Sequence, residues 1–145
     1  MHDPYDLERF VTAQNHADIY DDAVNELRRG RKTSHWMWFV FPQIAGLGHS
    51  AMSRKFAITS LDEAAAYLRH PVLGPRLLAC TRIVAEMPGH TAEQIFGVLD
   101  AQKLRSSMTL FRQAAPNEPA FAQALDHYFD GTLDPATERH LRLQV

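Results

Sequence analysis

Apolar residues recur at helical spacing along most of the chain. The first stripe consists of Leu7, Phe10 and Val11. Similar stripes follow at Tyr20, Val24 and Leu27, at Leu73, Leu77, Val84 and Met87, at Leu104, Met108 and Phe111, and at Phe121, Leu125 and Tyr128. This spacing predicts amphipathic helices, each of which turns one apolar face toward a common core.

Helix start signals precede several of these stripes, whereas comparable strand signals are scarce. Each signal is a residue whose side chain can accept hydrogen bonds from the free backbone N–H groups of a first helical turn. They are followed by a proline or by a capping-box partner, at Asp3-Pro4, Ser60 with Glu63, Thr91 with Gln94, and Asp134-Pro135, while Asp100 and Asn117 are further candidates. The pattern predicts an all-α fold.

One apolar run has no helical periodicity, namely the six residues 36–41, WMWFVF. Periodicity alone does not distinguish a strand from a buried helix here. A lone strand among helices would bury unpaired backbone donors and acceptors, whereas a short helix satisfies its own. We therefore predict a single compact domain, residues 1–145, in which several helices surround a buried central helix over residues 34–41.

Composition excludes several classes of protein. The chain has 145 residues, 46% of them hydrophobic and 22% charged, which is typical of a folded domain. Its formal net charge of -2 argues against nucleic acid as the main partner. The N-terminus lacks the pattern of a signal peptide and no apolar run would span a bilayer, so we expect a cytoplasmic protein without membrane contact. Cys80 is the single cysteine, and its spacing from Leu77 and Val84 suggests a buried position.

The residues just before the apolar run form the first candidate binding segment. Residues 28–35, RRGRKTSH, place a basic cluster against the predicted helix start. Free N–H groups there, with Ser34, Arg31 and Lys32, could hold a phosphate or carboxylate. Alternatively, Ser34 caps the helix and the basic side chains only stabilise the end of the preceding one.

Aromatic and amide side chains follow in the same segment. Trp36 and Trp38 could stack a planar base, although tryptophans in an apolar run are more often part of the core. Gln43 follows Phe41 and Pro42, where it could line a pocket or only close a loop. If the domain is an enzyme, which the sequence leaves open, His35 is the expected general acid or base because histidine changes charge near neutrality.

A second candidate segment is the helix predicted over residues 100–107. Ser107 lies beside the apolar stripe of Leu104 and Met108, and Lys103 is within one turn of both Ser106 and Ser107. A serine that faces the interior needs a hydrogen-bond partner, which is either a ligand or a nearby backbone carbonyl. Gln14, which continues the first apolar stripe, needs a polar partner for the same reason.

Motifs for metals and cofactors are absent from the sequence. The eight histidines are scattered without an HExxH pair, and there is no Walker loop, GxGxxG fingerprint or GxSxG elbow. We therefore predict no metal site and no cofactor.

Five long segments of unusual composition span nearly the whole chain, namely DLERFVTAQN, ELRRGRKTSHWMWFVFPQIAGLGHS, FAITSLDEAAAYLRHPVLGPRLL, IFGVLDAQKLRSSMTLF and HYFDGTLDPAT. Together they resemble the domain of unknown function 1810 family. The resemblance implies an all-helical fold around a buried central helix and brings no established activity. Bacterial members are often labelled calpastatin, but calpastatin inhibitory domains are disordered until bound, whereas this chain has the composition and caps of a folded domain.

These observations predict a pocket between the 31–43 segment and the 100–107 helix that binds a small phosphorylated or nucleotide-type anion. The predicted ligand-binding residues are Arg31, Ser34, His35, Trp38, Gln43, Lys103, Ser106 and Ser107. We expect Arg31, His35, Lys103 and Ser107 to meet around one partly open cavity. The alternative is a non-enzymatic protein-interaction module with an unknown protein partner, in which the motif residues form a structural buried polar network.

Overall fold

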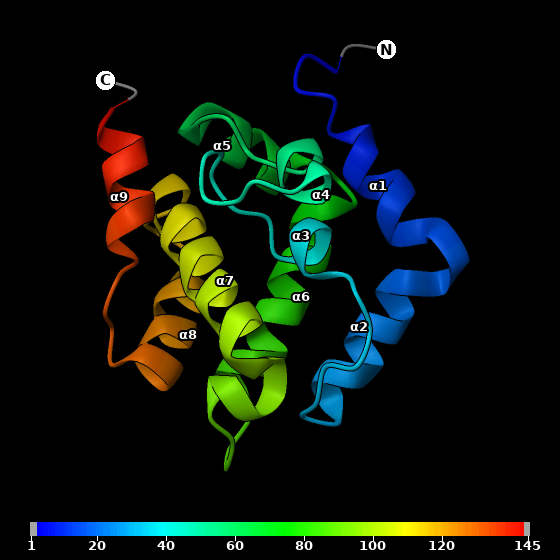
Figure 1. The fold of residues 1–145 in the computed structure, drawn as a ribbon, viewed down its shortest axis with the longest axis vertical. Coiled ribbons are helices and arrows are strands. Elements are labelled where there is room, and N and C mark those ends of the chain that lie inside the picture. Colours follow the sequence, from blue (N-terminus) through cyan, green and yellow to red (C-terminus); the bar gives the residue numbers. More distant parts are fainter. Residues whose placement is uncertain (1–2, 144–145) are drawn as a thin grey trace.

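Helices form nearly all of the regular structure in the computed structural model, which describes residues 3–143 (Figure 1). In chain order they are α1 (Glu8–Asn15), the 3-10 turn η1 (His16–Asp18), α2 (Ile19–Arg28), α3 (Met37–Val40), α4 (Ala51–Lys55), α5 (Leu61–Arg69), α6 (Leu73–Glu86), α7 (Ala92–Ala114), α8 (Pro119–Phe129) and α9 (Pro135–Arg142). Within the described range, β-pairing is limited to one parallel bridge between Ile44 and Ile58. The predicted all-α fold is confirmed.

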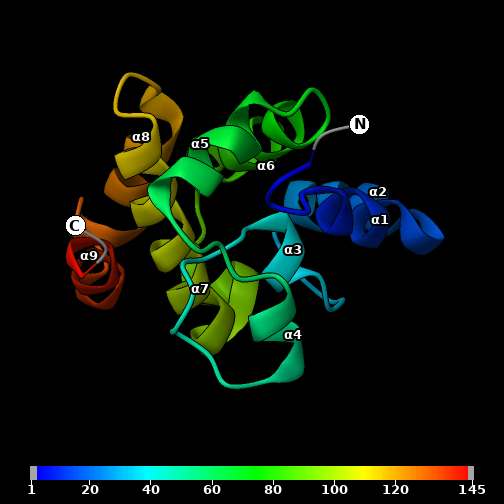
Figure 2. The ribbon, with the colours of Figure 1, turned by 90° about the horizontal axis from the view of Figure 1, so that it is seen from above.

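The longest helices pack against one another through the predicted apolar stripes. Helix α6 packs against α2, α5 and α8, while α7 packs against α5, α8 and α9. In Figures 1 and 2 the helices α1 and α2 lie on one side of this bundle and α9 lies on the other. Leu77, Leu104, Phe111 and Phe121 of the predicted stripes are buried. Within residues 3–143, no helix combines the length and the apolarity needed to cross a membrane.

The short helix α3 lies among the other helices and is buried, as predicted, but it is shorter than expected (Figure 2). It begins at Met37, whereas the prediction placed its start at Ser34. The amides of Thr33 and Ser34 bond to a carboxylate of α2 instead of starting the helix. The chain before Met37 is therefore irregular, with φ -138° at Trp36.

Three of the predicted helix caps are confirmed. The side chains of Ser60, Thr91 and Asp134 accept hydrogen bonds from backbone amides of the first turns of α5, α7 and α9. The predicted cap at Asn117 is wrong by one residue, because Glu118 accepts from the amide of Ala120 at the start of α8. Asp3 accepts from the amides of Leu7 and Glu8, although α1 begins only at Glu8.

Asp100, another predicted cap, lies inside α7 instead. The helix is interrupted shortly before it at Gly97, where φ is 81° and ψ is 165°. Asp100 therefore occupies the first turn after the interruption. Its carboxylate bonds to lysine side chains, as described below, and not to the amides of that turn.

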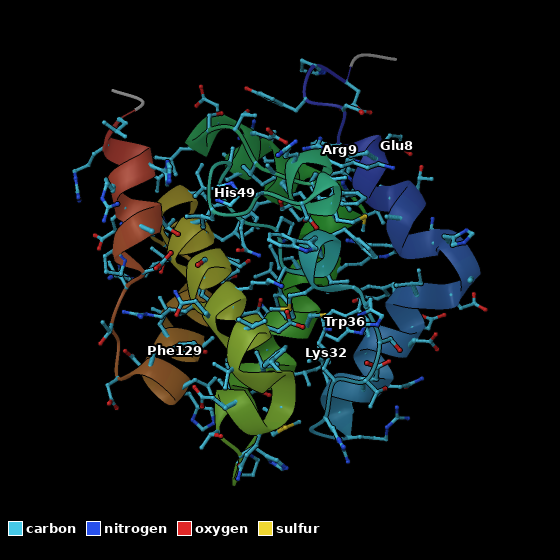
Figure 3. All side chains as sticks on the ribbon, in the orientation of Figure 1. Glu8, Arg9, Lys32, Trp36, His49 and Phe129 are labelled. Atoms are coloured by element: carbon cyan, nitrogen blue, oxygen red, sulfur yellow. The ribbon has the colours of Figure 1, made fainter. Side chains whose placement is uncertain are left out.

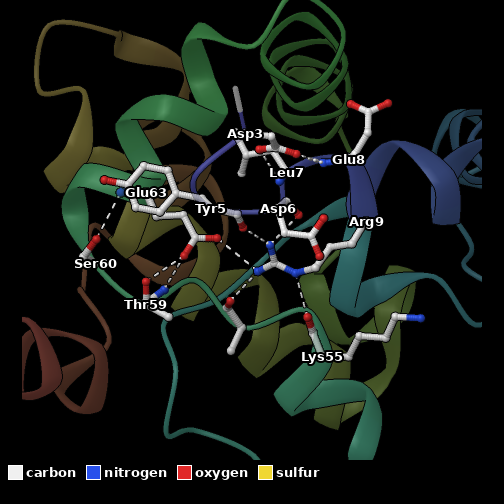
Figure 4. Close-up of polar contacts among 11 residues, drawn as sticks. Asp3, Tyr5, Asp6, Leu7, Glu8, Arg9, Lys55, Thr59, Ser60 and Glu63 are labelled. Atoms are coloured by element: carbon white, nitrogen blue, oxygen red, sulfur yellow. Dashed lines mark hydrogen bonds and ion pairs between the residues drawn. The ribbon is translucent and has the colours of Figure 1, made fainter. Parts of the chain in front are cut away.

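The guanidinium of Arg9 fastens α1 to the segment that leads into α5 (Figure 4). Its nitrogens donate to the carbonyls of Lys55 and Ala57 at 2.7 and 2.8 Å, and Nη2 also lies 3.0 Å from Oε2 of Glu63. The other carboxylate oxygen of Glu63 accepts from the amide of Thr59 at 2.9 Å. This arrangement fixes residues 55–59, which include the bridge partner Ile58.

Candidate functional site

The segment between α2 and α3 is organised by one buried carboxylate, that of Glu26 in α2, which is 2% exposed. Its Oε1 accepts from the amides of Thr33 and Ser34 at 2.7 and 2.9 Å and from Nε1 of Trp36 at 3.0 Å. Its Oε2 accepts from the Ser34 hydroxyl at 2.6 Å. Burial raises the pKa of a carboxyl, but here these hydrogen bonds outweigh it and lower the pKa of Glu26 to about 2. The hydroxyl of Ser34 is thus engaged inside the protein.

This carboxylate should make the domain sensitive to acid. The pKa of Glu26 rises from about 2 in the folded state to 4.5 when unfolded, so its contribution is complete above pH 4.5 and is lost as the pH falls toward 2. That difference corresponds to roughly 3 kcal/mol. We expect the free energy of unfolding to fall between pH 6 and pH 2 in both the wild type and Glu26→Gln. The fall should be roughly 3 kcal/mol smaller in the variant, as measured by urea unfolding. If the free energy of unfolding depended on pH in the same way in both proteins, the assignment of the acid sensitivity to Glu26 would be contradicted.

Two lysines and one aspartate join this segment to α7. Oδ2 of Asp100 lies 2.8 Å from Nζ of Lys32, and Oδ1 lies 2.9 Å from Nζ of Lys103. Burial raises the pKa of Asp100, but the two ammonium groups outweigh it and lower that pKa below its ordinary value. Lys32 also donates to the carbonyl of Ser34. The side chain of Lys32 is 8% exposed and that of Lys103 is 26% exposed, so Lys103 is the more accessible cation.

Each ammonium lies over a tryptophan ring. Nζ of Lys32 lies 5.0 Å from the ring centroid of Trp36, and Nζ of Lys103 lies 4.6 Å from that of Trp38. Figure 3 shows Lys32 and Trp36 close together between α2 and α7. Trp36 is 1% exposed and packs edge-on against the ring of Phe96, so it belongs to the core. Trp38 is half-buried and remains available to a ligand.

Two neighbouring cavities share the side chains of Trp38 and Lys103. The first, which we call the ammonium cavity, has a volume of about 280 Å³, and its polar lining residues are Lys32, His35, Ser50, Asp100 and Lys103. The second, which we call the amide cavity, has a volume of about 330 Å³ and is lined by Trp38, Gln43, Leu47, Leu99, Gln102, Lys103, Ser106, Asp134 and Ala136. Both volumes are near the lower end of the range for small-molecule sites.

Gly48 allows the loop before α4 to approach the tryptophan that both cavities share. A Cβ atom at this position would lie 2.9 Å from the Cη2 atom of Trp38 and 2.8 Å from the side chain of Ser53. Both distances are shorter than real Cβ contacts allow. The absence of a side chain at Gly48 thus lets the loop pack closely on the edge of the indole.

The structure brings together some of the predicted site residues and separates others. His35, Trp38 and Lys103 line the ammonium cavity, and Trp38, Gln43, Lys103 and Ser106 line the amide cavity. Of the four side chains expected to meet, His35 and Lys103 do so. Arg31 is exposed and lines neither cavity, because the chain turns at Gly30 as it leaves α2. Ser107 also lines neither cavity, since it lies on the fully buried face of α7.

Several other singled-out side chains are engaged in internal networks. Ser106 donates to Oδ2 of Asp134 at 2.8 Å, and the same oxygen accepts from the hydroxyl of Thr137 at 2.6 Å. This network joins α7 to the start of α9. Gln14 donates to the carbonyl of Phe39 at 2.8 Å and accepts from Arg76 at 3.1 Å. These contacts hold helices together without a ligand.

Sequence reasoning missed Glu26 entirely and treated Asp100 only as a cap. A signal for Glu26 exists, because it lies next to Leu27 and three positions after Ala23, both of which are buried. A charged residue within an apolar stripe needs polar partners in the folded protein. The sequence offers no comparable sign that Asp100 pairs with Lys32, 68 positions earlier.

The two cavities are lined by several hydrogen-bond donors and by the carboxylates of Asp100 and Asp134. The ammonium of Lys103, the imidazole of His35 and the amide of Gln43 suit anions or carbonyl acceptors. Within residues 3–143, no group of three or more histidine, cysteine, aspartate or glutamate side chains is arranged to hold a metal ion.

Comparisons with known proteins identify the family. No curated protein matches the chain. Among solved structures, the chain is similar to the crystal structure of the conserved hypothetical protein Rv1873 from Mycobacterium tuberculosis, with 50% sequence identity and a TM-score of 0.93. That match covers 97% of this chain and 99% of the other. The family model described as "Protein of unknown function (DUF1810)" matches residues 4–141. The chain therefore belongs to the DUF1810 family.

Proposed function

We propose that the two cavities bind a small phosphorylated or nucleotide-type anion. The observation that carries this proposal is the position of Lys103, whose side chain lines both cavities. An ammonium group has three N–H donors. Within residues 3–143, Lys103 uses one of them, toward Asp100. Two donors thus remain for a ligand.

The local charge supports an anionic ligand. Asp100 is shared between Lys32 and Lys103, so the three side chains together carry one positive charge, whereas the whole chain has a formal net charge of -2. The Trp38 ring below Lys103 holds the ammonium in place. An anion would receive a charge-assisted hydrogen bond from Lys103 and a further one from His35 at the rim.

Removal of the Lys103 charge should therefore weaken anion binding. A thermal-shift screen with inorganic phosphate, pyrophosphate, ribose 5-phosphate and the nucleoside monophosphates would give the first hits. By calorimetry, Lys103→Met should bind such a hit about tenfold more weakly or worse, because it loses a charge-assisted hydrogen bond while keeping the apolar stem over Trp38. The affinity of the wild type should also fall as the salt concentration rises.

Lys55→Met is the matched control, because it removes the same charge from a lysine that lies over Phe56 and lines neither cavity. Its affinity for the hit should equal that of the wild type. Equal affinities in Lys103→Met and the wild type would contradict the proposal.

A second candidate function is a protein-interaction module. The adjacent side chains Val98 and Leu99 are 74% and 78% exposed, which is unusual for two consecutive apolar residues. The networks of Glu26 and Asp134 also satisfy several motif residues internally. Under this alternative, the thermal-shift screen yields no anion that stabilises the domain.

A further inference from the structure

The lining of the amide cavity includes a glutamine whose side chain has an unsatisfied hydrogen-bond donor. Gln43 is 4% exposed, and its amide nitrogen Nε2 is buried without a hydrogen-bond partner. In residues 3–143 the same is true of the hydroxyls of Thr81 and Ser107, but neither of these lines the ammonium or the amide cavity. A buried donor without a partner costs free energy, and most such groups in proteins are satisfied. The position of Gln43 therefore suggests an acceptor that is supplied by a ligand.

The remaining walls of this cavity suit an uncharged, flat group. Trp38, Leu47 and Leu99 provide apolar surface, and Leu99 leaves 78% of its surface exposed unless something covers it. The carboxylate of Asp134 lies in the same cavity and is already bonded to Ser106 and Thr137. This negative charge disfavours a phosphate group on that side.

The two cavities thus differ in the chemistry that they accept. The ammonium cavity has two lysines and His35 against one carboxylate, whereas the amide cavity combines an orphaned amide donor and the apolar surface of Trp38, Leu47 and Leu99 with the carboxylate of Asp134. Trp38 and Lys103 line both, so the two cavities are adjacent. A molecule that occupies both needs an anionic end and a flat end that bears a hydrogen-bond acceptor.

We infer that the ligand is a nucleotide whose heterocyclic base occupies the amide cavity while its phosphate reaches Lys103 from the ammonium cavity. Gln43 donates from Nε2 to a ring carbonyl or ring nitrogen of the base and is the specificity-determining residue. The indole of Trp38 and the side chain of Leu99 contact the base. This inference rests on the proposed function, since it requires that the phosphate binds at Lys103.

The test compares ribose 5-phosphate with adenosine, guanosine, cytidine and uridine 5′-monophosphates by calorimetry on the full chain. All five share the ribose and the phosphate, and ribose 5-phosphate carries a hydroxyl where the four nucleotides carry the base. At least one nucleotide should bind the wild type about tenfold more tightly than ribose 5-phosphate does. Gln43→Leu should abolish this advantage and leave the affinity for ribose 5-phosphate unchanged.

Leu99→Ser is the second variant, because an exposed leucine can be replaced without loss of folding. It should likewise reduce nucleotide affinity and spare ribose 5-phosphate, so the inference stays testable if Gln43→Leu fails to fold. If ribose 5-phosphate binds through Lys103 but no nucleotide binds more tightly, or if both variants keep the nucleotide preference, the inference is overturned and the proposed function stands. If none of the phosphate compounds in the thermal-shift screen binds, the proposed function itself fails.

Discussion

Replacement of Glu26 by alanine is expected to lower the free energy of unfolding by about 4 kcal/mol, a large fraction of the stability of a small domain. The variant leaves four donors without their acceptor, namely the amides of Thr33 and Ser34, the Ser34 hydroxyl and the indole N–H of Trp36. Each unsatisfied buried donor costs about 1 to 3 kcal/mol, reduced where water can enter. Denaturant unfolding followed by circular dichroism measures the loss.

The matched control is Glu86→Ala, at the last residue of α6, where the side chain is exposed. Its free energy of unfolding should stay within about 0.5 kcal/mol of the wild type. A comparable loss in both variants would contradict the assignment of this stability to the four hydrogen bonds of Glu26.

Trp36→Ala should destabilise the domain by about 3 to 5 kcal/mol, because it empties a fully buried site and removes the hydrogen bond to Glu26. The indole packs against the rings of Phe41 and Phe96, with centroids 6.2 and 6.5 Å away. Trp38→Ala is the natural comparison. Because the Trp38 ring is only half-buried, this substitution should lower the free energy of unfolding less than Trp36→Ala does, and it should lower ligand affinity more.

Urea unfolding of both variants, together with binding of a phosphate compound, separates the two roles. Trp36→Phe adds a finer probe, because it keeps a buried ring and loses only the N–H donor toward Glu26. If Trp36→Ala lowered the free energy of unfolding by less than about 1 kcal/mol, Trp36 would belong to the binding surface and not to the core.

Much of the fold could be predicted from the sequence, because helix starts and apolar stripes are local signals. The caps at Ser60, Thr91 and Asp134 and the buried stripes of α6, α7 and α8 were predicted in this way. The start of α3 could not be predicted in this way. Ser34 has the chemistry of a helix cap, but its hydroxyl bonds to Glu26, eight positions earlier, instead. Local sequence patterns do not reveal that a distant carboxylate competes with the first helical turn for the same polar groups.

The candidate site was predictable in part for a related reason. Lys103 and Ser106 lie on a regular helix, where residue spacing fixes direction, and both line the amide cavity. Arg31 lies in an irregular segment, where neighbouring side chains point in unrelated directions, and it lines neither cavity. Ser107 is one position from Ser106 and therefore faces the core.

The interruption of α7 at Gly97 has a stereochemical consequence. A Cβ atom at this position would meet nothing within 4 Å, so volume does not restrict the residue. The restriction lies in the backbone, because φ 81° with ψ 165° is open almost only to glycine among L-residues. Reversal of both signs gives about -81° and -165°, an extended conformation that L-residues adopt readily. Position 97 thus selects for handedness: a D-alanine introduced by chemical synthesis would adopt this backbone conformation without strain, whereas L-alanine would strain the backbone.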